Sequence, residues 1–193
     1  MATAHNPTRR TIMAALASLP LSGCAASTSA NSEARPSGSK TLVAYFSRSG
    51  NTRVVAGLIQ RSLGADVFEI RPASPYPEDY LETVEKARVE RDEGIEPALE
   101  RRIDAIAAYE TVYLGFPIWG ETAPPVIRSF LRAHDLSGKV LVPFITHGGY
   151  GPGTSLSVLE AHAPNAALKD AFAMEADQER RTMNQVREWL AAR

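Results

Sequence analysis

The sequence predicts an α/β fold built on a doubly wound parallel sheet, because strand-like and helix-like segments alternate five times from residue 41 onward. The continuous apolar runs at 41–46, 111–116 and 140–145 are typical of central strands buried on both faces. Crossovers between parallel strands are right-handed, so the carboxyl ends of the strands meet at one edge of the sheet. Ligands of such sheets bind at that edge, and the loops that follow the strands are therefore the candidate site.

The remaining elements follow from hydrophobic periodicity and turn residues. Two further strands are predicted at 66–70 and 170–174, and helices at 52–63, 124–132, 154–161 and 179–192. The connection 71–110 is long and opens with prolines. We expect it to hold a charged helix over 78–91 and a second helix with Leu99, Ile103 and Ile106 at helical spacing. The charged runs in this connection are interpreted as solvated helix faces.

Composition limits the classes of function. The 193 residues are 44% apolar, which suits one domain with a short tail. A net charge of −1 gives no bulk attraction to nucleic acid, so no nucleic-acid partner is expected. The single cysteine, Cys24, excludes an intrachain disulfide or a thiolate cluster. The four histidines show no metal-ligand spacing, so no metal is expected.

Residues 1–24 are interpreted as an export signal. The run from Thr8 to Met13 contains Arg9-Arg10 and resembles a twin-arginine signal, an interpretation we favour over the plain positive region of a general secretory signal. The apolar stretch that follows is too short to span a bilayer, which takes ~20 residues. Leu21-Ser22-Gly23-Cys24 then matches the bacterial lipobox. It implies cleavage before Cys24 and lipidation of that cysteine.

Residues 25–40 are small and polar and cannot bury enough apolar surface to fold. They are predicted to be a flexible tether between the lipid and a domain at 41–193. The protein is therefore expected on the periplasmic or other extracytoplasmic face of a bacterial membrane, anchored through the lipid at Cys24.

The loop after the first strand has the composition of a phosphate site. It places hydroxyls, a glycine and backbone N–H groups at the positive end of a helix. It lacks the lysine of a Walker A loop and the glycine spacing of a dinucleotide fingerprint. An ordinary turn with Asn51 or Thr52 as N-cap is the alternative. The candidate residues are Ser47, Arg48, Ser49, Gly50, Asn51 and Thr52.

The loop after the third strand carries a tryptophan followed by a glycine and an acid. Trp119 offers a wide aromatic face for a planar ligand, and Gly120 can adopt either sign of φ. A core role for Trp119 and a solvated role for Glu121 are the alternatives. The candidate residues are Pro117, Ile118, Trp119 and Gly120.

The loop after the fourth strand contains four glycines between residues 146 and 153, which allows the backbone to approach a ligand closely. Its alternative is a glycine loop with an exposed tyrosine and a structural or solvent-facing histidine. The candidate residues are Thr146, His147, Gly148, Gly149 and Tyr150.

Together, at these positions of the alternating pattern, the three loops resemble those of the flavodoxin-like FMN proteins over about residues 40–193. The resemblance implies five strands in the order 2-1-3-4-5, helices on both faces, and FMN between the first and third strands. It also implies phosphate at 47–52, stacking on Trp119, and a Gly120 peptide that turns so that its carbonyl accepts from flavin N5–H. Tyr150 would cover the second flavin face, or Thr146–Gly149 would bind the pyrimidine edge. His147 is a candidate proton donor to a substrate quinone.

The chain departs from that family's pattern in its weak acidity, in Arg48 within the phosphate loop, and in the long connection 71–110, which is expected to shape a substrate or partner surface. Two functions stay open. One is electron transfer to a redox partner protein. The other is an FMN-dependent NAD(P)H:quinone-type oxidoreductase that acts on a small molecule. A binding module without flavin is disfavoured by the phosphate loop and Trp119.

Overall fold

The computed structural model describes residues 38–176 and 179–192, all of which belong to one compact unit, Ser32–Arg193. The predicted export signal, Cys24 and nearly all of the predicted tether lie outside the described residues. Within the described part of the chain, no helix is long and apolar enough to cross a membrane.

The sheet is parallel and has the predicted strand order. β1 (Thr41–Tyr45) lies between β2 (Asp66–Glu69) and β3 (Thr111–Pro117), and β4 (Val140–His147) pairs with the other side of β3. In the register, Pro117 lies opposite Thr146. The loops that follow these strands therefore start side by side, as the fold class predicts.

The fifth strand position is divided between two short strands. β5 (Ala167–Leu168) pairs with the start of β4, and β6 (Phe172–Glu175) pairs with its end. Residues 169–171 separate them, in a region where the sequence predicts one strand over 170–174. Because both strands lie on the same side of β4, the five-position architecture is kept.

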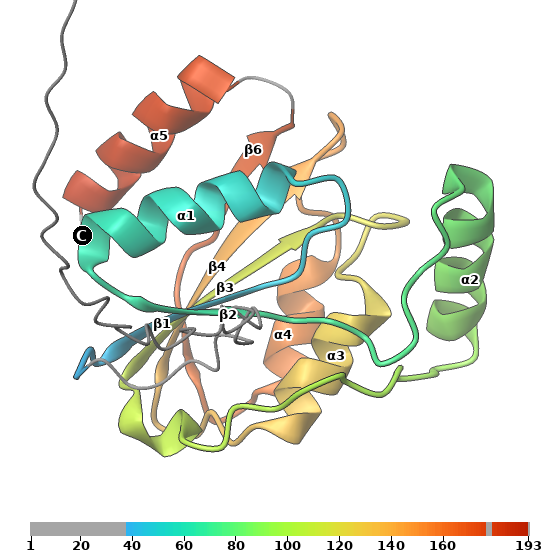
Figure 1. Ribbon diagram of the computed structural model, residues 1–193, viewed down its shortest axis with the longest axis horizontal. Helices are drawn as coiled ribbons and strands as arrows, with labels where there is room; N and C mark the ends of the chain where they lie inside the picture. Colours follow the sequence, from blue (N-terminus) through green and yellow to red (C-terminus); the bar gives the residue numbers. More distant parts are fainter. Residues whose placement is uncertain (1–37, 177–178, 193) are drawn as a thin grey trace, which may run out of the picture. The chain divides into compact units, whose positions relative to one another are not determined.

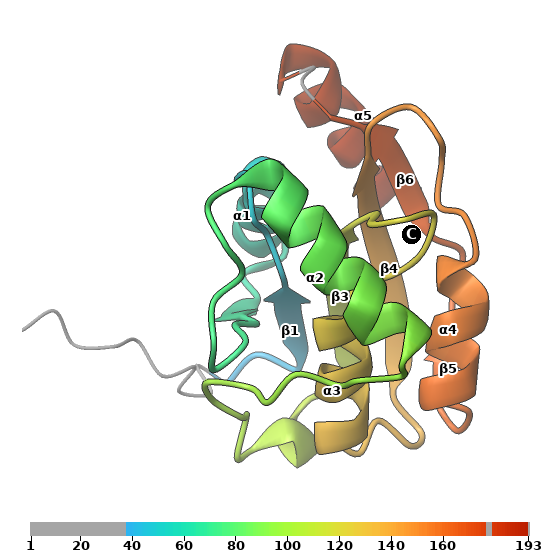
Figure 2. The same ribbon diagram turned by 90° about the vertical axis from the view of Figure 1, so that its right-hand side faces the viewer.

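Two layers of helices enclose the sheet (Figure 1). On one face, α1 (Asn51–Leu63) and α5 (Glu179–Ala191) pack with the inward side chains of one strand parity, such as Val43. On the other, α3 (Pro125–Ala133) and α4 (Ser155–His162) pack with the opposite parity. The second view shows α3 and α4 side by side against the sheet (Figure 2). Both strand faces are buried, which explains their continuous apolar sequences.

In the connection after β2, one prediction holds and one fails. The charged helix forms as α2 (Tyr80–Asp92), with Asp79 as N-cap accepting from the Glu82 amide at 2.9 Å. The predicted second helix through Leu99 and Ile103 is wrong, and only a 3-10 turn, Ile106–Ala108, is present there. Leu99 instead bridges Pro72 in an extended pairing.

The extended path has a physical cause. The amide of Ala73 donates to Ala98 O at 2.7 Å, and the amide of Glu100 donates to Arg71 O at 2.9 Å. The buried Ile103 donates its amide to Nε2 of His134 at 2.9 Å. These bonds to distant segments satisfy the backbone without a helix, and the apolar side chains still reach the core.

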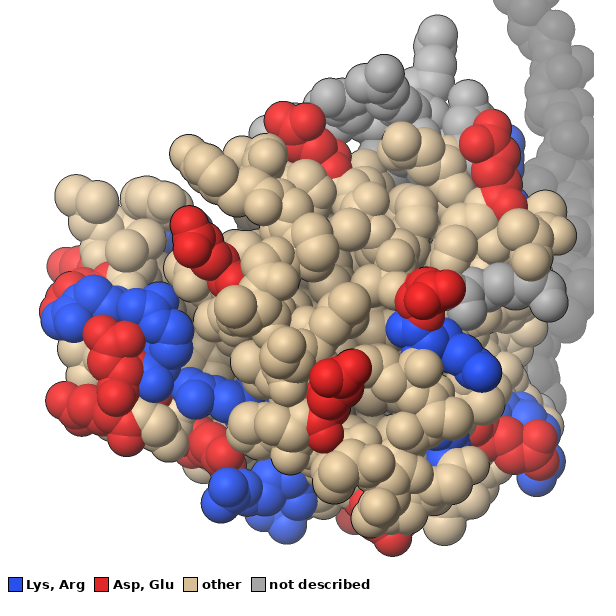
Figure 3. Space-filling view, turned by 180° about the vertical axis from the view of Figure 1, so that it is seen from behind, with Lys and Arg blue, Asp and Glu red and all other residues tan. Residues whose placement is uncertain are grey.

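α2 lies off the carboxyl ends of the strands rather than on a sheet face (Figures 1 and 2). Seen from behind, charged side chains of both signs gather most densely where α2 lies (Figure 3). They include pairs between Arg88 and both Glu85 and Asp92. The connection thus places a charged helix beside the loops that the sequence marks as the site.

Candidate cofactor site

The loop after β1 has the geometry of an anion site at a helix start. Gly50, at φ 98°, is the N-cap of α1, and the Ser47 hydroxyl accepts from the amides of Gly50 at 3.2 Å and Arg53 at 3.3 Å. Among the described residues, no group accepts from the amides of Asn51 and Thr52. Free amides at the positive end of a helix suit a phosphate group.

Thr52 links the first loop to the third. Its side chain is 1% exposed, and its Oγ1 lies 2.8 Å from Oγ1 of Thr146. Of the two hydroxyl hydrogens, one is used between the two oxygens, so the pair keeps one hydrogen for a further acceptor. The alternative role for Thr52 as an N-cap is wrong, since Gly50 takes that position.

A cavity of about 600 Å³, the main cavity, joins the first two loops. Three arginines line it, Arg48, Arg88 and Arg91, and no acidic residue does. Its volume falls in the range of ligand pockets, ~300–1,000 Å³. The predicted site residues that line it are Arg48, Ser49, Asn51, Pro117, Ile118, Trp119 and Gly120. The main cavity is therefore suited to an anionic ligand with an aromatic part.

Two aromatic rings hold Trp119 in place. Phe46 and Tyr76 pack edge-on against its ring, with centroids at 5.2 and 4.8 Å. The Tyr76 hydroxyl donates to Oε2 of Glu90 on α2 at 2.7 Å, and burial together with this bond raises the pKa of Tyr76 well above its ordinary value. Trp119 thus has the core contacts of one interpretation and also lines the main cavity, while its stacking on a ligand stays a prediction.

Residues 119–122 form a tight turn with unusual backbone angles. The amides of Trp119 and Thr122 each donate to the other's carbonyl, at 3.0 and 3.4 Å. Gly120 has φ 57° and Glu121 has φ 63°, and positive φ at both central residues is the mark of a type I′ turn. Such an angle is costly for glutamate, which has a Cβ.

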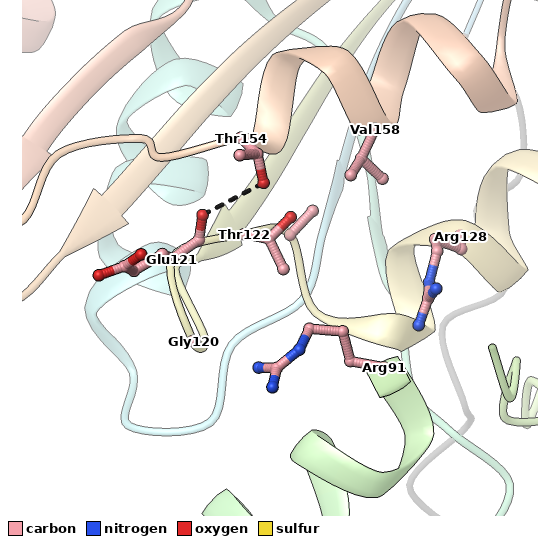
Figure 4. Close-up of a pocket in the computed structure, with 8 residues that line it drawn as sticks. Arg91, Gly120, Glu121, Thr122, Arg128, Thr154 and Val158 are labelled. Atoms are coloured by element: carbon pink, nitrogen blue, oxygen red, sulfur yellow. Dashed lines mark hydrogen bonds between the residues drawn. The ribbon is translucent and has the colours of Figure 1, made fainter. Parts of the chain in front are cut away.

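Hydrogen bonds from the N-cap of α4 hold the turn in place. The Glu121 carbonyl accepts from the Thr154 amide at 2.9 Å and from the Thr154 hydroxyl at 3.4 Å, the latter drawn as a dashed line in Figure 4. A Cβ on Gly153 would lie 1.9 Å from that carbonyl oxygen, so only glycine fits there. The turn's ends and the Glu121 carbonyl are therefore fixed, whereas the Gly120–Glu121 peptide has no hydrogen bond within the described chain.

The third loop does not line the main cavity. Tyr150 is 85% exposed, and Nδ1 of His147 accepts from the Gly149 amide at 3.1 Å. Gly148 and Gly149 are exposed. Contact between these residues and a ligand remains a prediction. Thr146 is the residue of this loop that bonds to the first loop, through Thr52.

The sequence indicates a substrate or partner surface in the connection 71–110, but not which residues of α2 form it. Charged side chains such as Glu85 and Arg88 are exposed, as a solvated face requires. One side of the helix also lines the main cavity, through Tyr80, Thr83, Val84, Ala87, Arg88 and Arg91. A signal was present, since Tyr80 and Val84 interrupt the charged pattern at helical spacing and remain exposed.

A second cavity, of about 330 Å³, adjoins the main cavity and shares Arg91 and Gly120 with it. We call it the side cavity. Its remaining walls come from residues 121–123, from Arg128 on α3, and from Thr154 and Val158 at α4. Figure 4 shows Arg91 and Arg128 entering it from the two different helices.

Comparison with known proteins agrees with this geometry. A family model described as flavodoxin matches residues 40–192. The chain belongs to the flavodoxin family. A protein of Bacteroides eggerthii assigned as a flavoprotein is 33% identical (TM-score 0.68), with 79% of this chain and 96% of that one covered. A similar protein of Bacteroides uniformis is 30% identical (TM-score 0.70; 78% and 97% covered).

A flavoprotein of Lactobacillus acidophilus, solved in complex with FMN, shares the fold at 21% identity (TM-score 0.60; 75% and 97% covered). Among curated proteins, none matches this chain.

In this flavodoxin-family chain, Arg48 of the first loop has no acidic partner in the described chain, unlike its neighbours Arg53 and Arg71. The guanidinium of Arg53 donates to Glu69 at 2.5 Å, and Arg71 does so at 2.7 Å. Burial would raise the pKa of Glu69, but the two arginines outweigh it and hold that pKa below its ordinary value. Arg48 bonds only a backbone carbonyl, that of Glu78, so its charge is not neutralised by an ion pair in the described chain.

Replacing Glu121 by glycine should make the folded chain more stable when FMN is absent. The left-handed angle costs a residue with a Cβ about 1–2 kcal/mol, and the greater freedom of glycine in the unfolded chain offsets part of the gain. We expect the free energy of unfolding to rise by roughly 0.5–1 kcal/mol in urea titrations. Glu121→Ala is the matched control, because it removes the carboxylate and keeps the strain. Equal stability of the two variants would show that the angle carries no cost.

Proposed function

We propose that this chain binds FMN at the main cavity and transfers electrons through it. The observation that carries the proposal is the pairing of a phosphate-binding helix start with a cavity walled by Trp119 and lined by three arginines. FMN, when bound, supplies the electron chemistry, and the protein positions it and tunes its potential. Family membership and the FMN complex of the Lactobacillus acidophilus protein support the assignment.

The residues present fit the two ends of FMN. The free amides of Asn51 and Thr52, the Ser49 hydroxyl and the spare hydrogen of the Thr52–Thr146 pair suit the phosphate. Arg48 adds an unpaired positive charge beside them. The face of Trp119 and the Gly120 backbone suit the ring. Tyr150 and the rest of the third loop are proposed to contact the ring's other side.

The turn at Gly120 supplies a conformational choice. Rotating the Gly120–Glu121 peptide would convert the type I′ turn into type II′, which needs positive φ only at Gly120. The rotation would reverse the Gly120 carbonyl and relieve the strained angle of Glu121. We propose that this carbonyl responds to the protonation of a ring nitrogen, and that the strain at Glu121 lowers the cost of that response.

Two kinds of electron acceptor are proposed, a redox partner protein and a small molecule. The side cavity favours a small molecule as the second candidate, because it opens beside Gly120 and is large enough for a compact organic ligand. In that case the chain acts as an FMN-dependent oxidoreductase, and α2 covers both the cofactor and the substrate.

We also propose that the chain works outside the cytoplasm on a lipid anchor. The lipobox ending at Cys24 and the paired arginines before it support this location. A twin-arginine route exports folded proteins, so FMN would be loaded before export. Expression in a bacterium should place the chain in the membrane fraction, and Cys24→Ala should release it. A wild-type chain that stays in the cytoplasm would contradict the proposal.

Loss of the phosphate-binding hydroxyls should separate FMN from riboflavin, which lacks the phosphate. For the double variant Ser49→Ala/Thr52→Val we expect the Kd for FMN to rise about 10- to 100-fold, because hydrogen bonds to a charged group are lost. The Kd for riboflavin should change much less, because riboflavin has no phosphate for these hydroxyls to bind. Flavin fluorescence titration of the full-length chain measures both constants.

Ser62→Ala serves as the control, because Ser62 is an exposed residue at the far end of α1. Equal weakening of FMN and riboflavin in the double variant would remove the phosphate from this loop.

A further inference from the structure

Two residues that line the side cavity each carry a buried polar atom without a hydrogen-bond partner in the described chain. These atoms are Oγ1 of Thr122 and Nε of Arg128. Thr122 is 9% exposed. Buried polar groups in native proteins are almost always paired, so two unpaired atoms on residues that line one small cavity indicate a missing partner.

The positive charge of the side cavity is also incompletely balanced. Arg128 makes one hydrogen bond, to the Glu90 carbonyl at 3.3 Å, and no ion pair within the described chain. Arg91 pairs with Asp92 at 2.9 Å, which leaves its Nη1 directed at Gly120. A partly buried guanidinium without a counterion favours an anionic partner.

The nearby carboxylates do not serve as that partner. Glu90 receives the Tyr76 hydroxyl, and Asp92 lies on the other side of Arg91, shared with Arg88. Figure 4 shows the Glu121 side chain pointing away from both arginines. The side cavity therefore offers donors from three elements, and its one acidic lining residue in the described chain, Glu121, directs its carboxylate away from them.

We propose that the side cavity binds the carboxylate of a small organic acid, held beside the turn at Gly120. Arginine binds carboxylates through two parallel N–H···O bonds from one guanidinium, and Arg128, which lines the side cavity, uses only Nη2 in a hydrogen bond within the described chain. The Thr122 hydroxyl beside it is a further donor without an acceptor. Ala123 and Val158 form an apolar wall that suits a carbon skeleton. This inference rests on the proposed function in one respect. If the electron acceptor is a small molecule, the inference identifies its chemical class as an organic acid.

Benzoate and uncharged benzamide test the site, because they share one shape and differ in charge. Isothermal titration of the full-length chain, with and without FMN, should show saturable binding of benzoate, with benzamide weaker by about tenfold or more. Arg128→Gln should weaken benzoate by about tenfold or more, since it removes both the charge and Nε. Thr122→Val, which keeps shape and volume, should weaken it by about two- to tenfold.

Arg132→Gln is the matched control. Arg132 lies on the same helix, is 73% exposed and pairs with Glu96 outside the side cavity, so benzoate affinity should not change. If Arg128→Gln fails to fold by circular dichroism, Thr122→Val carries the test. Absence of saturable benzoate binding overturns the inference. So does binding of inorganic phosphate without benzoate, and so does an equal loss in Arg128→Gln and Arg132→Gln.

The two proposals fail separately in this design. FMN binding is read from flavin absorbance, independently of benzoate. A chain that binds benzoate and no FMN contradicts the proposed function alone, whereas a chain that binds FMN and no benzoate contradicts only this inference.

Discussion

The site depends on a short series of partly buried contacts that attaches α2 to the strand ends. Phe46, at the end of β1, packs against Trp119, Trp119 packs against Tyr76, and the Tyr76 hydroxyl bonds Glu90 on α2. α2 lies outside the two helical layers, and the bonds from Arg128 to the Glu90 carbonyl and from Arg48 to the Glu78 carbonyl add to its attachment. Because α2 walls the main cavity, the same aromatic contacts that complete the core also create the space for a ligand.

The arrangement also brings arginines from two elements to one cavity. Arg88 and Arg91 of α2 line the main cavity while pairing with Glu85 and Asp92, whereas Arg48 bonds the Glu78 carbonyl just before α2 and has no acidic partner in the described chain. An anionic cofactor would therefore join the first loop to α2. The weak overall acidity of the chain differs from the acidic surface expected of a simple electron carrier.

The sheet and two of the three loops could be predicted from the sequence because local signals and tertiary packing agree there. Val43 and Leu42 belong to a continuous apolar run that only a doubly covered strand can bury. The failed helix near Leu99 and Ile103 shows the limit. Its apolar spacing fitted a helix, but pairing with Pro72 and the His134 bond supply the backbone's partners from distant segments.

The side cavity could not be predicted for the same reason. Arg91 and Arg128 lie on different helices, and nothing in the sequence around Thr122 distinguishes it from an ordinary loop residue.

The main cavity allows the most direct test of the whole account. A crystal structure of the full-length chain with FMN should place the phosphate on the amides of Asn51 and Thr52 and the ring against Trp119. FMN bound with its phosphate elsewhere, or a ring distant from Trp119, would contradict it.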